Sequence, residues 1–151
     1  MNLLRESPGI GIAEMGKKLK VSTVTVRSIL NTLSEKGFIL RTWGGAVPAF
    51  HPSMMEQIKS HVEEKNRIAK AAASLIEDGE TVMIEAGTTT ALIARYLLGK
   101  RDITIVSNNT LLLPYARTNP SLRLTLVGGE FRPQTESLVG PIALAELEMA
   151  A

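Results

Sequence analysis

The sequence predicts a protein of mixed α/β class in two parts: a helical first part that ends in a hairpin, and a second part built on a partial parallel sheet. Three observations support this prediction. The 151 residues are 44% apolar, which is enough for a buried core. Two amphipathic helical patterns lie within residues 12–33. After residue 80, short apolar strand patterns alternate with helical patterns of about ten residues.

Composition and charge narrow the class of protein. The chain has no cysteine, which excludes disulfides and thiolate metal sites. No apolar run approaches the ~20 residues that span a bilayer, and the N-terminus lacks the layout of a signal peptide, so we expect a soluble cytoplasmic protein. Residues 1–50 have a net charge of +4, from seven Lys and Arg against three Glu, whereas residues 51–151 have −2, from ten against twelve acidic residues. A basic first part joined to a mildly acidic second part suggests a polyanion-binding first domain, although a small basic domain with only a solvated positive face has the same charge pattern.

The clearest local pattern is a pair of helices within residues 12–33. Ile12, Met15 and Leu19 share one face of the first helix, and Gly16 provides the small residue that two steeply crossing helices need at their contact. Val21 is expected to fill the turn between them. The apolar residues of the second helix are Val24, Val26, Ile29, Leu30 and Leu33. Of these, Val26, Ile29 or Leu30, and Leu33 have the spacing to bury against the first helix.

The second helix has polar residues where it would face a ligand. Ser22 precedes this helix, and its hydroxyl can cap a free backbone N–H there. The outer side has short hydrogen-bonding groups and one Arg, which suit base edges and phosphates in a DNA major groove. These residues are Thr23, Thr25, Arg27, Ser28 and Asn31. An ordinary helical hairpin with a solvated polar face fits the same pattern equally well.

A hairpin follows the second helix directly. Gly37 can end the helix, residues 38–40 have the pattern of a short strand, and residues 41–45 that of a tight turn. A hairpin in this position is the wing of a winged helix-turn-helix. Arg41 and Thr42 at its tip would reach phosphates or the minor groove. Trp43 fits two positions equally, at the tip or packed inward.

Glycines and prolines between residues 44 and 52 interrupt any periodic pattern. We therefore expect a winged helix-turn-helix domain over 1–47, a linker over 48–61 and a second domain over 62–151. A helical pattern runs from about Met54 through Ile76.

The second domain alternates strands and helices. Strands are predicted at 81–85, 103–106 and 122–127, and helices at 89–98 and 110–117. This order implies right-handed crossovers and a parallel, Rossmann-like sheet. Such sheets bind ligands beyond the C-terminal ends of their strands.

Residues 87–90 (Gly-Thr-Thr-Thr) follow the first of these strands and open a helix. Free backbone N–H groups and threonine hydroxyls favour an anion in such a place. A capped turn without a ligand has the same sequence pattern. Glu85, Ser107 and the pair Gly128-Gly129 also fall at the C-terminal ends of the predicted strands.

Taken in order, these motifs resemble those of the DeoR family, bacterial repressors that mostly govern sugar-catabolism operons. Residues 21–27, 30–33, Gly37 and 40–47 are similar to the winged helix of that family. Further similar segments follow in the family's order at residues 64–73, 85–90, 106–109, 127–130 and 138–141.

The resemblance implies a repressor that binds double-stranded operator DNA as a dimer or tetramer and is released by a phosphorylated sugar. It implies DNA contacts by Ser22, Thr23, Thr25, Arg27, Arg41 and Thr42. The expected effector-binding residues are Glu85, Gly87, Thr88, Thr89, Thr90, Ser107, Asn108, Gly128 and Gly129. We expect no cofactor and no metal site.

Three residues depart from the family pattern. Ser28 replaces a second Arg, which removes one phosphate-neutralising charge and is expected to lower both DNA affinity and its salt dependence. Lys20 replaces a glycine of the turn, and Trp43 replaces a histidine of the wing. We expect the operator to differ accordingly.

Two other classes of function stay open at this point. The sensor fold is shared with ribose-5-phosphate isomerase and glucosamine-6-phosphate deaminase, where proton transfer on a sugar needs a placed carboxylate such as Glu85 or Glu130. We expect both to be ordinary loop carboxylates. His51 and His61 are isolated, so no catalytic residue is predicted. The other class is a non-catalytic fragment without regulated DNA binding.

The resemblance also implies that the sensor is truncated. Family members continue well beyond the equivalent of Ala151. A partial sheet has an unpaired edge. We therefore expect the truncated sensor to bind its effector weakly.

Overall fold

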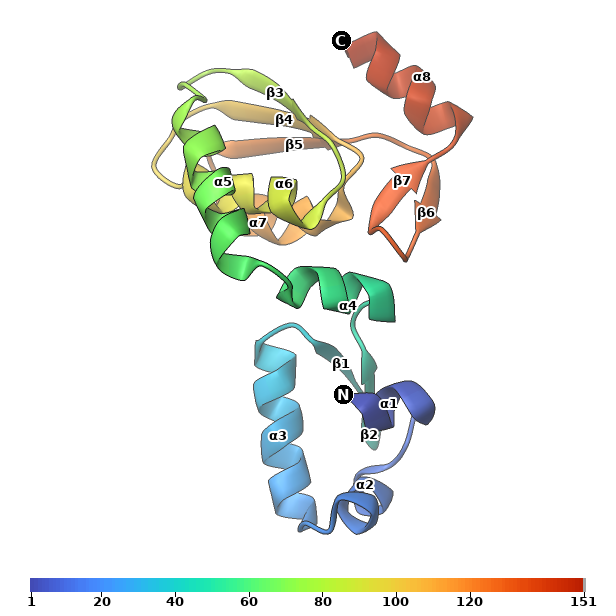
Figure 1. Cartoon of the computed structure of the whole chain (residues 1–151). Coiled ribbons are helices and arrows are strands. Elements are labelled where there is room, and N and C mark those ends of the chain that lie inside the picture. The colour runs from blue at the N-terminus through green and yellow to red at the C-terminus, as the bar shows by residue number, and fades with distance from the viewer. Residues whose placement is uncertain (151) are drawn as a thin grey trace. The chain divides into compact units, whose positions relative to one another are not determined.

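The chain folds into two compact units, residues 1–55 and 56–151, and the computed structural model describes residues 1–150 (Figure 1). Three helices and a hairpin form most of the first unit. They are α1 (Asn2–Glu6), α2 (Ile12–Leu19), α3 (Thr23–Glu35), β1 (Ile39–Thr42) and β2 (Gly45–Pro48). The strands pair antiparallel, with Thr42 opposite Gly45, so Trp43 and Gly44 form the turn. The first unit is the winged helix-turn-helix that the sequence predicts.

The core of the first unit lies between its helices and the hairpin. Its buried residues are Leu4, Ile10, Met15, Val26, Leu30, Ile39 and Ala46. Leu30 packs inward, whereas Ile29 is 45% exposed. Of the alternatives that the helical spacing allowed, Leu30 is therefore the buried residue.

The turn between α2 and α3 is closed by backbone rather than by a side chain. Val21, expected to fill this turn, is 37% exposed. Its N–H instead donates to the carbonyl of Gly16 at 3.0 Å. A Cβ added to Gly16 would lie 2.9 Å from the carbonyl oxygen of Val21. The predicted need for a small residue at this crossing is confirmed, and the role predicted for Val21 is wrong.

The single helix expected from about Met54 through Ile76 is two helices, α4 (Pro52–Lys59) and α5 (Val62–Ser74). His61 adopts the left-handed conformation, with φ 49° and ψ 40°, and this residue interrupts the helical path. α4 lies within the residues expected as a linker. Pro52 begins it, and the first position of a helix suits proline because its N–H has no helical partner.

The second unit is built on a parallel sheet with strand order β3-β4-β5. These strands are β3 (Thr81–Ile84), β4 (Ile103–Ser107) and β5 (Leu122–Leu126). The connections are α6 (Thr88–Ala91) with the 3-10 segment η1 (Leu92–Leu97), and η2 (Thr110–Leu112) with α7 (Leu113–Thr118). The architecture is the predicted Rossmann-like one, although much of each expected crossover helix is 3-10 helix.

Helices cover one face of the sheet, and α8 packs against part of the other. Ile103 and Ile105 of β4 lie in a core shared with α5, η1 and η2, on the face where Figure 1 shows α5, α6 and α7. Val106 belongs to the opposite face, where it packs with Val127 and with Ala143 of α8 (Pro141–Ala150). The antiparallel hairpin of β6 (Glu130–Arg132) and β7 (Ser137–Val139) was not predicted. Its strands of three residues are too short to show an alternating pattern.

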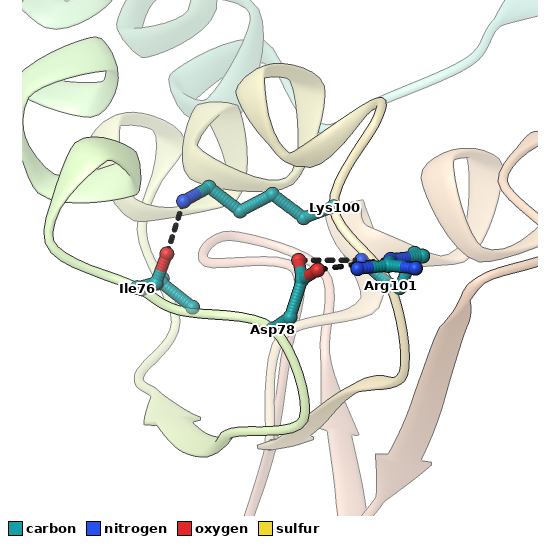
Figure 2. A network of polar contacts seen from close by, with 4 residues as sticks. All are labelled: Ile76, Asp78, Lys100 and Arg101. Atoms are coloured by element: carbon teal, nitrogen blue, oxygen red, sulfur yellow. Dashed lines mark hydrogen bonds and ion pairs between the residues drawn. The ribbon is translucent and has the colours of Figure 1, made fainter.

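Polar contacts join the two loops that precede β3 and β4 (Figure 2). The backbone N–H of Arg101 donates to Asp78 Oδ1 at 2.9 Å, and its Nε donates to Oδ2 at 3.0 Å. The Lys100 ammonium donates to the carbonyl of Ile76. These contacts fix the ends at which β3 and β4 begin, the ends opposite to the predicted site residues.

The helices among residues 1–150 include none with the length and apolar character that a membrane span requires.

Candidate nucleic-acid interface and effector site

α3 begins with a capped first turn. Ser22 Oγ accepts a hydrogen bond from the N–H of Thr25 at 3.1 Å, as the sequence predicts. The two side-chain oxygens are also hydrogen-bonded to each other at 2.9 Å. Both side chains are exposed. The bond therefore fixes two hydroxyls at the start of α3, and whichever oxygen donates, the pair keeps one O–H and two lone pairs for a ligand.

One face of α3 is free of core contacts. Arg27, Ser28 and Asn31 follow Val24 by three, four and seven residues, so the four side chains share one side of the helix, and all are exposed. Val26 and Leu30 are buried on the other side. The structure therefore brings three predicted DNA-binding residues onto one face, and Thr23 and Thr25 flank it.

Val24 is the member of this face that the sequence analysis missed. The sequence pattern identifies it only as an apolar residue of the second helix and predicts no DNA contact for it. In the structure Val24 is 70% exposed. The signal was present in the helical period, because position 24 falls in line with positions 27, 28 and 31 and not with 26 and 30.

The wing is joined to α3 and to α2. Arg41 of β1 donates from Nη1 to Asn31 Oδ1 of α3 at 2.7 Å, and both side chains are exposed. Thr42 ends β1 and is exposed as well. Trp43 is fully exposed at the turn, which decides between the two positions left open for it. The N–H of Ile12 donates to the carbonyl of Gly44 at 3.0 Å.

Charge on this unit favours an anion. Residues 1–55 have the net charge of +4 noted above, because residues 51–55 add no charged group. Among residues 1–150 the guanidinium of Arg27 has no hydrogen-bond or ion-pair partner. Lys18 pairs with Glu14 at 3.4 Å, and both side chains are exposed. An exposed ion pair is weak, so it changes the basic character of this unit little.

The predicted effector residues lie at one edge of the second unit's sheet. The register places Ile84 beside Ser107 and Ser107 beside Leu126. Glu85 and Asn108 come directly after Ile84 and Ser107, and the Gly128-Gly129 pair follows Leu126 by two and three residues. The structure therefore brings the three predicted strand ends together.

Two residues of this set hold the protein itself together. Ser107 is fully buried, and its hydroxyl donates to the carbonyl of Ile84 and accepts from the N–H of Asn109. Asn108 accepts from the N–H of Ala86 at 2.9 Å and donates to the carbonyl of Leu138 at 3.3 Å. These polar groups link β3, β4 and β7. The Ser107 hydroxyl is buried and bonded, whereas the half-buried Asn108 amide keeps one N–H and one oxygen lone pair.

The threonine loop divides into bonded and available groups. Thr90 Oγ1 donates to the carbonyls of Glu85 and Gly87, at 2.7 and 3.1 Å. Within residues 1–150, the hydroxyls of Thr88 and Thr89 have no protein partner, and both residues are half-buried. The available groups are therefore these two hydroxyls, the first N–H groups of α6 and the exposed Glu85 carboxylate.

The glycine pair after β5 is constrained by its neighbours. The N–H of Gly128 donates to Glu146 Oε2 of α8 at 2.6 Å. Gly129 has φ 129°, and a Cβ there would lie 2.6 Å from the carbonyl oxygen of Val139. Gly129 is thus required for the close approach of the chain to β7.

Candidate metal and catalytic groups are dispersed. No group of three or more His, Asp or Glu residues that could hold a metal ion occurs in the described part of the chain. His51 Nδ1 is hydrogen-bonded to Ser53 Oγ at 2.8 Å. Glu85 and Glu130 are exposed.

Two family models match the chain. The DeoR-like helix-turn-helix domain matches residues 1–49, and the DeoR C terminal sensor domain matches residues 60–150. Together they cover both units.

Curated relatives agree with these models. The chain is 35% identical over 144 residues to the HTH-type transcriptional repressor CsqR of Escherichia coli, which covers 93% of this chain and 55% of the relative. It is 31% identical over 147 residues to the glycerol-3-phosphate regulon repressor of Escherichia coli, covering 95% and 58%. It is 32% identical over 157 residues to the lactose phosphotransferase system repressor of Lactococcus lactis subsp. lactis, covering 98% and 61%. The chain thus spans somewhat more than half the length of the relatives it matches.

Proposed function

Because the chain belongs to the DeoR family of transcriptional regulators, we propose that it is a repressor that binds operator DNA through α3 and the wing. One observation supports this most directly. The exposed face of α3 presents Arg27, Ser28 and Asn31, and Arg41 of the wing is hydrogen-bonded to that face. Arg supplies charge for phosphates, and the short polar groups suit base edges in a major groove.

A selection experiment tests this function and does not require the operator sequence. The purified chain enriches duplexes from a randomised pool, and the affinity for the enriched site is then measured by fluorescence anisotropy at several salt concentrations. We expect a consensus sequence to emerge. Tighter binding to this site than to a shuffled duplex should persist at the higher salt concentrations, because base contacts add to the phosphate contacts.

A pair of arginine variants locates the interface. Arg27→Ala should weaken binding and reduce the slope of log affinity against log salt by about one, because one phosphate contact is lost. Arg117→Ala removes the same charge from α7 of the second unit and should leave both quantities nearly unchanged. No enriched sequence, or equal effects of the two variants, would count against DNA binding through α3.

We further propose that a phosphorylated sugar is the effector and that the loop of residues 87–90 binds its phosphate. The match of residues 60–150 to a sensor domain supports this, as does the name of one relative, a glycerol-3-phosphate regulon repressor. The free hydroxyls of Thr88 and Thr89 add donors beside the first N–H groups of α6. We assign no catalytic role to the chain, since the relatives are named as regulators.

Backbone NMR of the chain tests the effector proposal. Millimolar glycerol-3-phosphate should shift the amide resonances of Thr88, Thr89 and Thr90, because their N–H groups would donate to the phosphate. Glycerol at the same concentration is the control and should shift none of them. Equal shifts with both compounds, or shifts confined to other parts of the chain, would contradict a phosphate site in this loop.

A further inference from the structure

The side chain of Val24 is not part of the hydrophobic core of the first unit. It is the second residue of α3, 70% of its surface is exposed, and its neighbours on the same face are Arg27, Ser28 and Asn31. The hydroxyls of Thr23 and Thr25 flank it along the chain. Val24 is thus an apolar side chain at the N-terminal end of a polar face that includes Arg27, the end from which a recognition helix reaches base edges.

Two other exposed apolar residues, one in α2 and one in α3, have a different setting. Leu19 and Ile29 line an apolar pocket of about 360 Å³ between α1, α2 and α3, together with Leu3 and Leu33. Val24 does not belong to that pocket. Its exposure is therefore on the outer face, which is the face that the proposed function directs toward DNA.

The chemistry of the major groove supplies an apolar partner for this residue. Thymine is the base that presents a methyl group there, and apolar side chains contact it. The N-terminal residues of a recognition helix are the ones that reach base edges, and Val24 is in the first turn. A β-branched side chain has one strongly preferred rotamer in a helix, so Val24 is fixed in position before it meets DNA.

On the basis of the proposed function, we propose that Val24 is a specificity-determining residue that contacts the 5-methyl group of a thymine in the operator. The valine methyl groups replace water on the thymine methyl. A serine or a charged side chain at position 24 would lack the methyl groups of this contact, and the preference at that base pair would be lost.

Deoxyuridine tests the contact because it removes only the methyl group. In the site enriched by the wild-type chain, each thymine is replaced in turn by deoxyuridine, and affinity is measured by anisotropy. For the wild type, we expect one thymine position in each half-site to be sensitive. Replacing that single thymine should weaken binding about fourfold, the effect of uncovering one methyl group. For Val24→Ala, the same replacement should change the affinity by less than about 1.5-fold, because the contact is already lost.

Ile29→Ala is the matched control, because it also shortens an exposed β-branched residue of α3 but lies in the apolar pocket. It should keep the full wild-type sensitivity to deoxyuridine. Thermal unfolding followed by circular dichroism should show Val24→Ala to be folded, since alanine is the better helix former at an exposed position.

Two results would overturn the contact while leaving DNA binding intact: no deoxyuridine replacement weakens the wild type, or every replacement weakens wild type and Val24→Ala by the same factor. Failure of the proposed function would be seen separately, in the selection experiment that precedes the deoxyuridine test. In that case the selection yields no enriched sequence, and the assignment of Val24 falls with it.

Discussion

The bond between Arg41 and Asn31 joins the wing to the recognition helix through two exposed side chains. A free arginine side chain has about 2 kcal/mol of rotamer entropy to lose when it is ordered. The bond to Asn31 restricts Arg41 before DNA arrives. Asn31, for which the sequence predicts a DNA contact, can therefore contribute to binding by positioning Arg41.

We expect Asn31→Ala and Arg41→Ala each to weaken binding to the enriched site, and the double variant to be no weaker than Arg41→Ala alone. The reason is that Asn31 acts through Arg41, so its removal costs nothing once Arg41 is absent. Anisotropy titrations of the wild type, the two single variants and the double variant measure this coupling. Strictly additive losses would show that each residue contacts DNA independently.

Asp78 responds to pH through its contacts with Arg101. The Arg101 backbone N–H, and then its guanidinium, hold the pKa of the Asp78 carboxyl below its usual value. Since the pKa is lower in the folded protein, the stabilisation is fully present above the unfolded pKa of about 3.9. It is lost as the pH falls through the folded pKa.

Asp78→Asn should therefore unfold at a lower temperature than the wild type at pH 6, and the difference should shrink as the pH falls below about 4. The effect should be small, because both side chains are largely exposed. Glu77→Gln is a suitable control, since it removes an adjacent charge that has no such bonds. A difference in melting temperature that stays constant from pH 6 to pH 3 would contradict this account.

At the scale of elements, the crossing of α2 and α3 depends on Gly16. A Cβ there would lie 2.9 Å from a backbone oxygen that cannot move away without shifting the turn. Gly16→Ala should cost roughly 1–3 kcal/mol of unfolding free energy, as overpacking does. DNA affinity should fall as well, because α3 is displaced.

Gly11→Ala provides the comparison for this prediction. Its added Cβ would meet its nearest neighbour, the carbonyl oxygen of Gly44, at 3.9 Å, an ordinary contact. Urea unfolding followed by circular dichroism measures both variants. If Gly16→Ala were as stable as Gly11→Ala, the helix crossing would not depend on a small residue at position 16.

Long periodic elements were the predictable part of this fold. The amphipathic pattern of α3 and the apolar runs of the three parallel strands showed their type and their order. The break between α4 and α5 was not predictable, because the two residues that lie there, Ser60 and His61, are not strong helix breakers. The hairpin of β6 and β7 was not predictable either, because so few residues define it.

The predicted sites show the same limit. Helical spacing predicted that Arg27, Ser28 and Asn31 share a face. It could not predict that Asn108 bonds to the N–H of Ala86 and the carbonyl of Leu138, partners 22 and 30 residues away in the sequence. Motif similarity predicts which residues gather at a strand end, whereas the contacts of the folded chain determine which of their polar groups stay available.

At the scale of the whole molecule, charge and fold divide the chain at the same place. The unit of residues 1–55 has a net charge of +4, and the unit of residues 56–151 has −2. The basic unit contains the recognition helix, and the acidic unit matches the sensor domain. This division is consistent with one unit that binds a polyanion and another that binds a small ligand.

We propose that two copies of the chain bind one operator, because a single α3 contacts only a few base pairs and dimeric regulators place two recognition helices one helical turn apart. Duplexes with two selected half-sites should bind more tightly when the half-site centres are roughly 10 bp apart than when they are roughly 15 bp apart. The two duplexes have the same half-sites, but in the second these face opposite sides of the DNA. Anisotropy titrations at one salt concentration compare them, with a single half-site as the control. Equal affinity at both spacings, matching two independent single sites, would show that the copies bind separately.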